Sequence, residues 1–528
     1  MKVWRRGFYA IIEASGKAKK GIQRIIFSRA GIFLLLILLQ LGLFVVTSEI
    51  LQEYMIFIHG SFTVLGVVVL IYIINSEGNP AFKMTWMLCV MASPAVGTLG
   101  YIFVKNQIGS KWMRERLATL KLETDPYMQQ DVEIMDALRE SKPANANLAH
   151  FLSGPLGFPT YRNTEVTYFP LGEDKFEALI PELKKARKFI FMEYFIVEEG
   201  YMWETILDVL IDKAAQGVEV RFMYDGMCAI SMLPYDYPEQ IRRYGIKCKM
   251  VSPIRPFLST IQNNRDHRKI CVIDGKTGFT GGVNLGDEYI NKKERFGHWK
   301  DTAIMLKGDA VQSLTMLFLQ MWNVDERQQD DYQRYLTPKR PLTDSDLGYV
   351  LPYGDSPFDN ENVGEEVYFH ILNHSKKYVH IMTPYLILDN EMITTLTRTA
   401  KSGIEVIIIM PHIPDKWYAF AVAKTYYREL IRAGVQIYEY EPGFVHAKVF
   451  VSDDDTATVG TINLDYRSLY LHFECGVFIY DNAVVKDVEE DFQNTLKRCH
   501  KVSLIEVKKQ PLHLKMAGQV LRLFAPLM

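Results

Sequence analysis

Apolar residues are distributed unevenly along this chain and divide it into a front segment and a body. Three runs near the N-terminus are almost wholly apolar and span residues 31–47, 55–74 and 84–104. Each is long enough to cross a hydrocarbon core of about 30 Å as a helix. No small-residue cleavage site follows the first run, which argues against a removable signal peptide. We therefore predict a multi-pass membrane protein, with a basic tail at residues 1–29 and three transmembrane segments within residues 30–104.

Basic residues flank the three runs on both sides. Eight Lys and Arg against one Glu precede the first run, and a second basic cluster begins at Lys105. Both flanks favour the cytoplasmic side, whereas three complete spans would place them on opposite sides. Either one run does not cross completely or one flank is exported. The first run is interrupted by Gln40, and the third contains Ser93-Pro94, which can kink or re-enter.

Short apolar runs alternate with segments of helical period in the body, beyond a polar linker at residues 105–150. A strand at 189–197, a helix at 203–216 ended by Gly217, and a strand at 218–224 are predicted. The same order recurs at residues 378–410, where Gly403 ends the helix. This repetition predicts an α/β fold of two tandem halves related by a pseudo-twofold axis, at residues 151–340 and 341–528.

Charge and cysteine content limit the possible ligands and cellular compartment of the body. The first 116 residues carry 13 Lys and Arg against 5 Asp and Glu, and the remainder carries 47 against 57. An acidic body argues against binding of a nucleic-acid backbone, although a local basic groove could escape this count. Five of the six cysteines lie in the body without a C-x-x-C pair, so neither a disulfide framework nor a zinc site is predicted. Reduced thiols favour a cytoplasmic body, and no cofactor or metal is expected.

One polar motif occurs once in each half with the same internal spacing, H-x-K-x4-D-x6-G-x-x-N. The first copy consists of His267, Lys269, Asp274, Gly282 in the glycine-rich turn, and Asn284. The second copy consists of His446, Lys448, Asp453, Thr461 in the equivalent turn, and Asn463. Two matching sets indicate one site built from two equivalent halves.

The residue types of this motif suit phosphodiester chemistry. A His and a Lys two positions apart on a strand point to the same face. Two Lys and two Asn side chains, with turns that admit close backbone approach, would stabilise the added negative charge of a pentacoordinate transition state without a metal. One His would attack phosphorus, and the other would protonate the leaving alkoxide.

Carboxylates have different expected roles at this site. Asp274 and Asp453, although grouped with the catalytic sets, are expected to cap a turn or pair structurally. Asp301 and Glu474 each precede an apolar strand. A carboxylate there could hold an imidazole tautomer, so these two are candidate supporting residues.

Through the paired motifs the chain resembles the phospholipase D superfamily, and within it the bacterial cardiolipin synthases. The resemblance covers nearly the whole chain and includes residues 264–269, 281–284, 296–302, 460–468, 473–474 and 523–527. Two departures lie outside the motifs: His472 stands where Asn is common, and Asp309 where Pro is common. Residues 1–48 are additional to the usual two-span pattern.

The resemblance implies transphosphatidylation between two phosphatidylglycerol molecules of the membrane. His267 would attack the first lipid, release glycerol and hold a phosphatidyl group as a phosphohistidine. With His446 as acid and base, the hydroxyl of a second lipid would then yield cardiolipin. Glu193 and Tyr385, at the ends of equivalent strands, would line the pocket or pack in the core or at the rim.

Alternative functions stay open from the sequence alone. A phospholipase D-type hydrolase or a synthase using a different alcohol would carry the same motifs, as would a membrane-anchored phosphodiesterase acting on nucleic acid. A catalytically inactive scaffold is disfavoured because both copies of the motif are complete. The sequence does not indicate an oligomeric state.

Overall fold

The computed structural model describes residues 35, 38–42, 54–105, 108–253, 263–328, 330–338 and 347–527. The chain forms two compact units. One comprises Met1–Lys111, Ile254–Gln262 and Pro526–Met528, and the other comprises Trp112–Pro253 and Asn263–Ala525. The second unit, called the body below, contains both predicted halves and both copies of the motif.

The first unit contains one helix of transmembrane length among the described residues. This helix, α3 (Met55–Asn75), corresponds to the second predicted run. Its residues Ile56–Asn75 have a mean hydropathy of 2.3. The first predicted run, 31–47, falls mostly outside the described residues.

The third predicted run is not a continuous transmembrane helix. It is divided between α4 (Pro80–Ala92) and α5 (Pro94–Lys105). The division falls at Ser93 because Pro94 lacks an amide hydrogen and disfavours a helical residue before it. Helices of 13 and 12 residues are about 20 and 18 Å long, shorter than a hydrocarbon core of about 30 Å. The prediction of a full-length span is therefore not confirmed for this run.

The segment predicted as a polar linker is helical and packs on the body. It forms α6 (Ile108–Thr124), α7 (Val132–Ser141) and α8 (Pro143–Ser153). Ile134, Leu138 and Leu152 are buried, and Arg116 donates a hydrogen bond to the carbonyl oxygen of Asn323 at 2.8 Å. The four-residue spacing of Ile134 and Leu138 places both on one face of α7, and that spacing outweighs the polar average composition.

The first half of the body contains a seven-stranded sheet in the order β1-β8-β6-β5-β2-β3-β4. Its strands are β1 (Thr164–Phe169), β2 (Phe189–Tyr194), β3 (Glu219–Asp225), β4 (Lys247–Val251), β5 (Lys269–Ile273), β6 (Thr277–Gly281) and β8 (Ala303–Gly308). The helices packed on this sheet are α9 (Gly172–Lys185), α10 (Tyr201–Ala215) and α13 (Val311–Trp322). Two smaller helices, α11 (Cys228–Ser231) and α12 (Tyr237–Arg242), connect β3 to β4.

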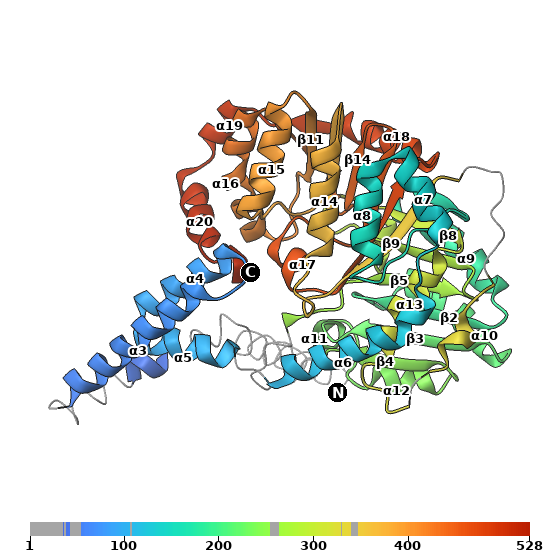
Figure 1. The fold of residues 1–528 in the computed structure, drawn as a ribbon, viewed down its shortest axis with the longest axis horizontal. Coiled ribbons are helices and arrows are strands. Elements are labelled where there is room, and N and C mark those ends of the chain that lie inside the picture. Colours follow the sequence, from blue (N-terminus) through green and yellow to red (C-terminus); the bar gives the residue numbers. More distant parts are fainter. Residues whose placement is uncertain are drawn as a thin grey trace, which may run out of the picture. The chain divides into compact units, whose positions relative to one another are not determined.

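The second half contains an eight-stranded sheet in the order β17-β12-β11-β10-β14-β15-β16-β9. Its strands are β9 (Tyr349–Asp355), β10 (Tyr378–Met382), β11 (Glu405–Pro411), β12 (Gln436–Tyr440), β14 (Val449–Ser452), β15 (Thr456–Gly460), β16 (Glu474–Tyr480) and β17 (Cys499–Lys501). Figure 1 shows α14 (Val363–His374), α15 (Asn390–Lys401) and α16 (Trp417–Ala433) side by side on this sheet. The helix α18 (Val484–Leu496) also packs on it.

The two sheets have the same strand order. Counted from β9, the second sheet repeats the first strand by strand and adds β17 at its far edge. Directions match as well, because β2 pairs parallel with β3 and antiparallel with β5, as β10 does with β11 and β14. Gly217 and Gly403, at φ +85° and +91°, follow α10 and α15 at equivalent points, where a left-handed residue ends a helix. The predicted tandem α/β fold is confirmed.

A shared hydrophobic core holds the two halves together. It contains Val272 of the first sheet, Val451 of the second sheet and Phe318 of α13, and each of these side chains is at most 1% exposed. The backbone ends of β5 and β14, and the histidines that precede them, are therefore held on a rigid base.

Candidate active site

Two short backbone pairings between the halves position the two motif histidines. Strand β7 (His298–Lys300) pairs parallel with β13 (Gly443–Val445), and the amide of His446 then donates to the carbonyl of Lys300 at 2.7 Å. In the same way Asp266 bridges Phe473, and the amide of His267 donates to the carbonyl of Phe473 at 2.9 Å. Each histidine thus lies beside the segment of the other half that leads into a carboxylate.

Each imidazole contacts the carboxylate of the other half. Nδ1 of His446 lies 2.6 Å from Oδ2 of Asp301, and Nδ1 of His267 lies 2.9 Å from Oε2 of Glu474. Both carboxylates are fully buried, and the two imidazoles are 8% and 6% exposed, respectively. A carboxyl oxygen that accepts the hydrogen on Nδ1 holds that tautomer and leaves the lone pair on Nε2. The sequence identified both acids but did not indicate that their pairing crosses between the halves.

The two motif lysines are buried beside the histidines. Lys269 and Lys448 are 1% and 2% exposed, and the ammonium group of each donates to the carbonyl oxygen of the histidine two residues before it. Burial lowers the pKa of Lys269 to about 8 and that of Lys448 to about 7. A cation so poorly solvated interacts strongly with an anionic phosphate group.

Burial, followed by the neighbouring lysine, lowers the pKa of both imidazoles. The pKa of His446 falls to about 4, where Asp301 partly offsets the shift, and that of His267 falls well below its ordinary value. Both rings are therefore neutral near pH 7, as a nucleophile or a general base requires.

The two carboxyl groups differ in their affinity for a proton. Burial raises the pKa of Glu474 to about 8, despite the opposing charge of Lys269. Burial also acts on Asp301, but His446 and Lys448 outweigh it and hold the pKa of that carboxyl below its ordinary value. Asp301 is thus ionised at neutral pH, whereas Glu474 carries a proton.

Gly282 and Thr461, predicted to bind substrate, instead contact the orienting acids. A Cβ atom at Gly282 would lie 2.0 Å from Oδ1 of Asp301, so this position must be glycine for the carboxylate to fit. The hydroxyl of Thr461 donates to the carboxyl of Glu474 and receives the amide of Cys475 at 3.0 Å. Both residues therefore support the acid that orients a histidine.

Asn284 and Asn463 brace the turns beside the site. Nδ2 of Asn284 donates to the hydroxyl of Tyr289 at 2.9 Å, and Nδ2 of Asn463 donates to Oγ of Ser468 at 3.0 Å. Oδ1 of Asn284 also receives the amide of Ile196 at 3.0 Å. An amide nitrogen has two hydrogens, of which each of these contacts uses one.

The motif aspartates lie at the far ends of β5 and β14 from the histidines. The carboxylate of Asp274 accepts the amides of residues 187–189 at 2.7–2.9 Å, and that of Asp453 accepts the amides of residues 376–378 at 2.6–3.1 Å. Asp274 follows His267 by seven positions along a largely extended chain, which amounts to at most about 23 Å. These contacts support the structural role expected for the two aspartates and provide no direct contact with the histidines.

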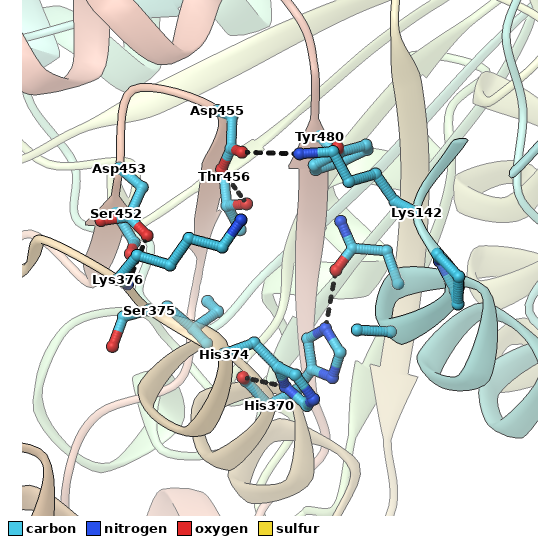
Figure 2. A pocket seen from close by; sticks show the side chains of 14 residues that line it. Lys142, His370, His374, Ser375, Lys376, Ser452, Asp453, Asp455, Thr456 and Tyr480 are labelled. Carbon is cyan, nitrogen blue, oxygen red and sulfur yellow. Dashed lines mark hydrogen bonds and ion pairs between the residues drawn. The ribbon is translucent and has the colours of Figure 1, made fainter. Parts of the chain in front are cut away.

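Figure 2 shows the surroundings of Asp453. The carboxylate borders a cavity of about 260 Å³ whose lining includes Lys142, His370, His374 and Tyr480 but neither motif histidine. The cavity lies where α8 and α14 meet the second sheet, away from the paired imidazoles.

A buried ionic cluster lies on the other face of β5. Arg268, between the motif His and Lys, forms ion pairs with Glu193 at 2.6 Å and with Asp266 at 3.0 Å. All three residues are at most 4% exposed. Glu193 is therefore a core residue beneath the site and not part of its lining. A single acid in the otherwise apolar strand FIFMEY was the signal that could have indicated a buried partner.

Aromatic rings surround the two imidazoles. The ring of His267 lies 4.8 Å from that of Phe195 and 5.9 Å from that of His472, measured between centroids. Around His446 the corresponding distances are 5.3–5.7 Å, to Tyr289, Trp299 and Phe444. His472, a departure from the family pattern, thus lies beside the motif histidine of the first half.

Tyr385 lies near the second copy of the motif. It precedes Leu386, which bridges Leu464 next to Asn463. Its hydroxyl donates to Asp415 at 2.6 Å and receives the ammonium of Lys416 at 3.1 Å.

The body contains two copies of one α/β sheet, which together supply two His-carboxyl pairs and two buried lysines to one site. This arrangement defines an enzyme of the phospholipase D type. The family model described as "Cardiolipin synthase, PLD-like domain" matches residues 179–322 and 368–496. The chain belongs to this family, which confirms the resemblance predicted from the paired motifs and the interpretation as a phosphatidyltransferase.

Individual relatives agree with the family assignment. A cardiolipin synthase of Geobacillus thermodenitrificans is 34% identical over 89% of this chain and 94% of its own length. A cardiolipin synthase of Alkalihalophilus pseudofirmus is 33% identical over 88% and 93%. An uncharacterized protein of Streptococcus mutans is 50% identical over 87% of this chain and 99% of its own length.

A solved structure shares the fold. Phosphatidylserine synthase of Haemophilus influenzae superposes with a TM-score of 0.55 at 16% identity, and the match covers 73% of this chain and 97% of that chain. At this identity the likeness concerns the fold alone.

Proposed function

We propose that this chain is a cardiolipin synthase that transfers a phosphatidyl group from one phosphatidylglycerol to another and releases glycerol. The observation that carries the proposal is the pair of buried imidazoles, each held at Nδ1 by a carboxyl group of the other half. The family membership and relatives of that name support it. The substrates are membrane phospholipids, and the acidic body disfavours nucleic acid.

In the first step Nε2 of His267 attacks phosphorus. A P–N bond forms, the P–O bond to glycerol breaks, and the leaving alkoxide takes a proton from Nε2 of His446. That proton is present because the bound phosphodiester and the ionised Asp301 both favour the imidazolium of His446. Lys269 and Lys448 stabilise the charge that develops on the phosphoryl oxygens.

In the second step the headgroup hydroxyl of another phosphatidylglycerol replaces glycerol. Its proton moves to Nε2 of His446, its oxygen attacks phosphorus, and the P–N bond to His267 breaks. The protons balance over the two steps, and water is neither consumed nor released. Asp301, the ionised acid, suits the histidine that changes protonation state, which supports His267 as the nucleophile.

Expression in a host devoid of cardiolipin, followed by lipid mass spectrometry, tests this function. Cardiolipin and free glycerol should appear in equal amounts at the expense of phosphatidylglycerol, and EDTA should not prevent it. Phosphatidic acid in place of cardiolipin would identify a hydrolase. Cardiolipin bearing one phosphatidyl group from another lipid class would identify a different donor.

We propose two complete spans, residues 31–47 and α3, with α4 and α5 forming a hairpin that returns to the side from which it entered. The shortness of α4 and α5 supports this arrangement. It places both basic flanks, and with them the body, in the cytoplasm. Labelling of single cysteines at residues 10 and 208 by an impermeant reagent on intact cells tests it, since neither site should react before permeabilisation.

A further inference from the structure

The last helix of the body, α20 (Leu512–Arg522), carries an exposed apolar stripe. Leu512, Met516 and Val520 are 72%, 61% and 56% exposed. Their spacing of four residues places them on one face of the helix. The stripe continues into Leu523 and Phe524, at 51% and 44% exposure. We call these five residues the α20 stripe.

The other face of α20 is fixed to α16. A Cβ atom at Gly518 would lie 2.5 Å from the carbonyl oxygen of Ala421, so the two helices meet at backbone distance. The guanidinium of Arg522 lies 4.1 Å from the ring centroid of Tyr426. The helix is therefore held in one orientation, with its stripe directed away from α16.

Basic residues accompany the stripe. Residues 501–528 contain five Lys and Arg and one acidic residue, Glu506, although the chain beyond residue 116 has ten more acidic than basic residues. Lys508 and Lys509 are exposed at the end of α19 (Leu504–Lys509), one turn before the stripe begins. An apolar face beside a local cluster of cations is typical of a helix that lies in the interface of an anionic membrane.

The helix that supports α20 also leads to the active site. Lys416, which contacts Tyr385, directly precedes α16. The first residue of α16, Trp417, is 63% exposed, and tryptophan is enriched where protein meets lipid headgroups. Trp417 lies four residues before Ala421, the residue of α16 that Gly518 of α20 meets.

We propose that the α20 stripe inserts into the headgroup region of an anionic phospholipid membrane and so docks the body on the bilayer that carries its substrate. Eleven residues reach only about 16 Å, too short to cross a core of about 30 Å, so α20 lies in the membrane plane. A second copy of the chain is a poorer occupant, because Lys508 and Lys509 would face like charges. This docking does not depend on the reaction catalysed.

The test uses the full chain in lipid nanodiscs with one environment-sensitive fluorophore. Met516→Cys carries the probe, in a background where Cys89 and Cys499, the two cysteines that are not fully buried, are replaced by Ala. A matched probe at Asp208→Cys, exposed on α10, serves as the control. Nitroxide-labelled lipids should quench the probe at residue 516 several-fold more than the probe at 208. Quenching should be greater in discs with phosphatidylglycerol than in discs of phosphatidylcholine alone, and salt should weaken that difference.

Two variants separate the apolar contribution from the charged one. Leu512→Ser with Val520→Ser should reduce quenching in every disc. Lys508→Gln with Lys509→Gln keeps the stripe intact and should remove only the gain from phosphatidylglycerol. Equal quenching at residues 516 and 208 would overturn the proposal. So would protection of residue 516 that appears only when two copies share a disc, since that would assign the stripe to a second chain.

Discussion

The two halves of the body share one framework but fill equivalent positions with opposite chemistry. In the first half a buried ionic cluster of Asp266, Arg268 and Glu193 lies beneath the catalytic strand. The strand pairings Glu193↔Ile270 and Met382↔Val449 show that Met382 is the counterpart of Glu193. The motif offset makes Val445 and Ala447 the counterparts of Asp266 and Arg268. The second half is therefore wholly apolar where the first is charged.

The charged set in the first half and the apolar set in the second show which of these side chains the shared fold requires. Because an apolar set supports the same strand order, the fold does not require buried charges at these positions. Buried ion pairs commonly contribute little net stability relative to apolar residues of similar volume. The halves differ again at the site, where Asp301 is ionised and Glu474 carries a proton. Equivalent positions thus have unequal roles, and each inequality can be tested by substitution.

The largest expected effect distinguishes the two histidines. His267→Ala should lower kcat about 10⁴-fold or more and form no phosphatidyl-enzyme, because the nucleophile is gone. His446→Ala should lower kcat about 10²–10⁴-fold yet still form that intermediate from a lipid with a good leaving group. Intact-protein mass spectrometry after rapid quenching checks both. An adduct in the His267 variant but not in the His446 variant would reverse the assignment.

The carboxyl groups should tolerate amide substitution unequally. Asp301→Asn should lower kcat about 10³–10⁴-fold, because an amide cannot stabilise the imidazolium of His446. Glu474→Gln should cost only about tenfold, since a Gln carbonyl can accept from Nδ1–H while its NH₂ group donates to Thr461. Steady-state rates at pH 7 measure both. Equal losses would mean that the two acids have the same protonation state.

Removal of one member of the ionic cluster should destabilise the first half. Arg268→Ala leaves two buried acids without a cation and should cost about 3–5 kcal/mol of unfolding free energy. The triple variant Asp266→Val, Arg268→Ala, Glu193→Met reproduces the second half and should recover most of that loss. Thermal unfolding in detergent provides the measurement. If the triple variant is as unstable as the single one, the ionic cluster is required for the fold of the first half.

On the alkaline side of the pH profile of kcat/KM, the ammonium group of Lys448 in the second half should lose its proton before that of Lys269. Lysines with lowered pKa are charged below that value and neutral above it. The value of about 7 for Lys448, against about 8 for Lys269, predicts that the decline of kcat/KM steepens by about one further tenfold per pH unit near neutrality, beyond the decline that loss of the His446 proton causes above its pKa of about 4. In Lys448→Arg this steepening should occur about one unit higher, whereas Lys269→Arg should leave it in place. The alkaline fall in kcat should occur at a higher pH than the fall in kcat/KM, because a bound phosphodiester raises the pKa of both ammonium groups.

The smallest effect on catalysis is expected at the motif aspartates. Asp274→Asn and Asp453→Asn should each lower stability by about 1–2 kcal/mol through weakened hydrogen bonds to three amides, with kcat/KM nearly unchanged. Asn is suited to this comparison because it tolerates the left-handed backbone of these positions, at φ +53° and +56°. A large loss of kcat/KM without a change in thermal stability would restore the catalytic interpretation.

Spacing within the chain predicted the repeated framework and the paired motifs, because both are local patterns that recur. Pairing across the halves could not be predicted, since it depends on Gly443–Val445 meeting His298–Lys300, more than 140 residues away. Asn284 and Asn463 suited a phosphate on chemical grounds, but hydroxyls five residues onward engage them first. The third apolar run met the hydropathy criterion for a span, and a single Ser-Pro step divided it.

The crossed backbone pairings have a consequence for the order of events during synthesis. His267 leaves the ribosome some two hundred residues before Glu474, and His446 is made long after the Asp301 that will hold it. Domains generally fold as they emerge, so the first half can form its sheet while its histidine still lacks a carboxyl partner. Both His-carboxyl pairs then form only when the second half has docked. A chain that stops before residue 446 therefore carries His267 without Glu474 and Asp301 without His446.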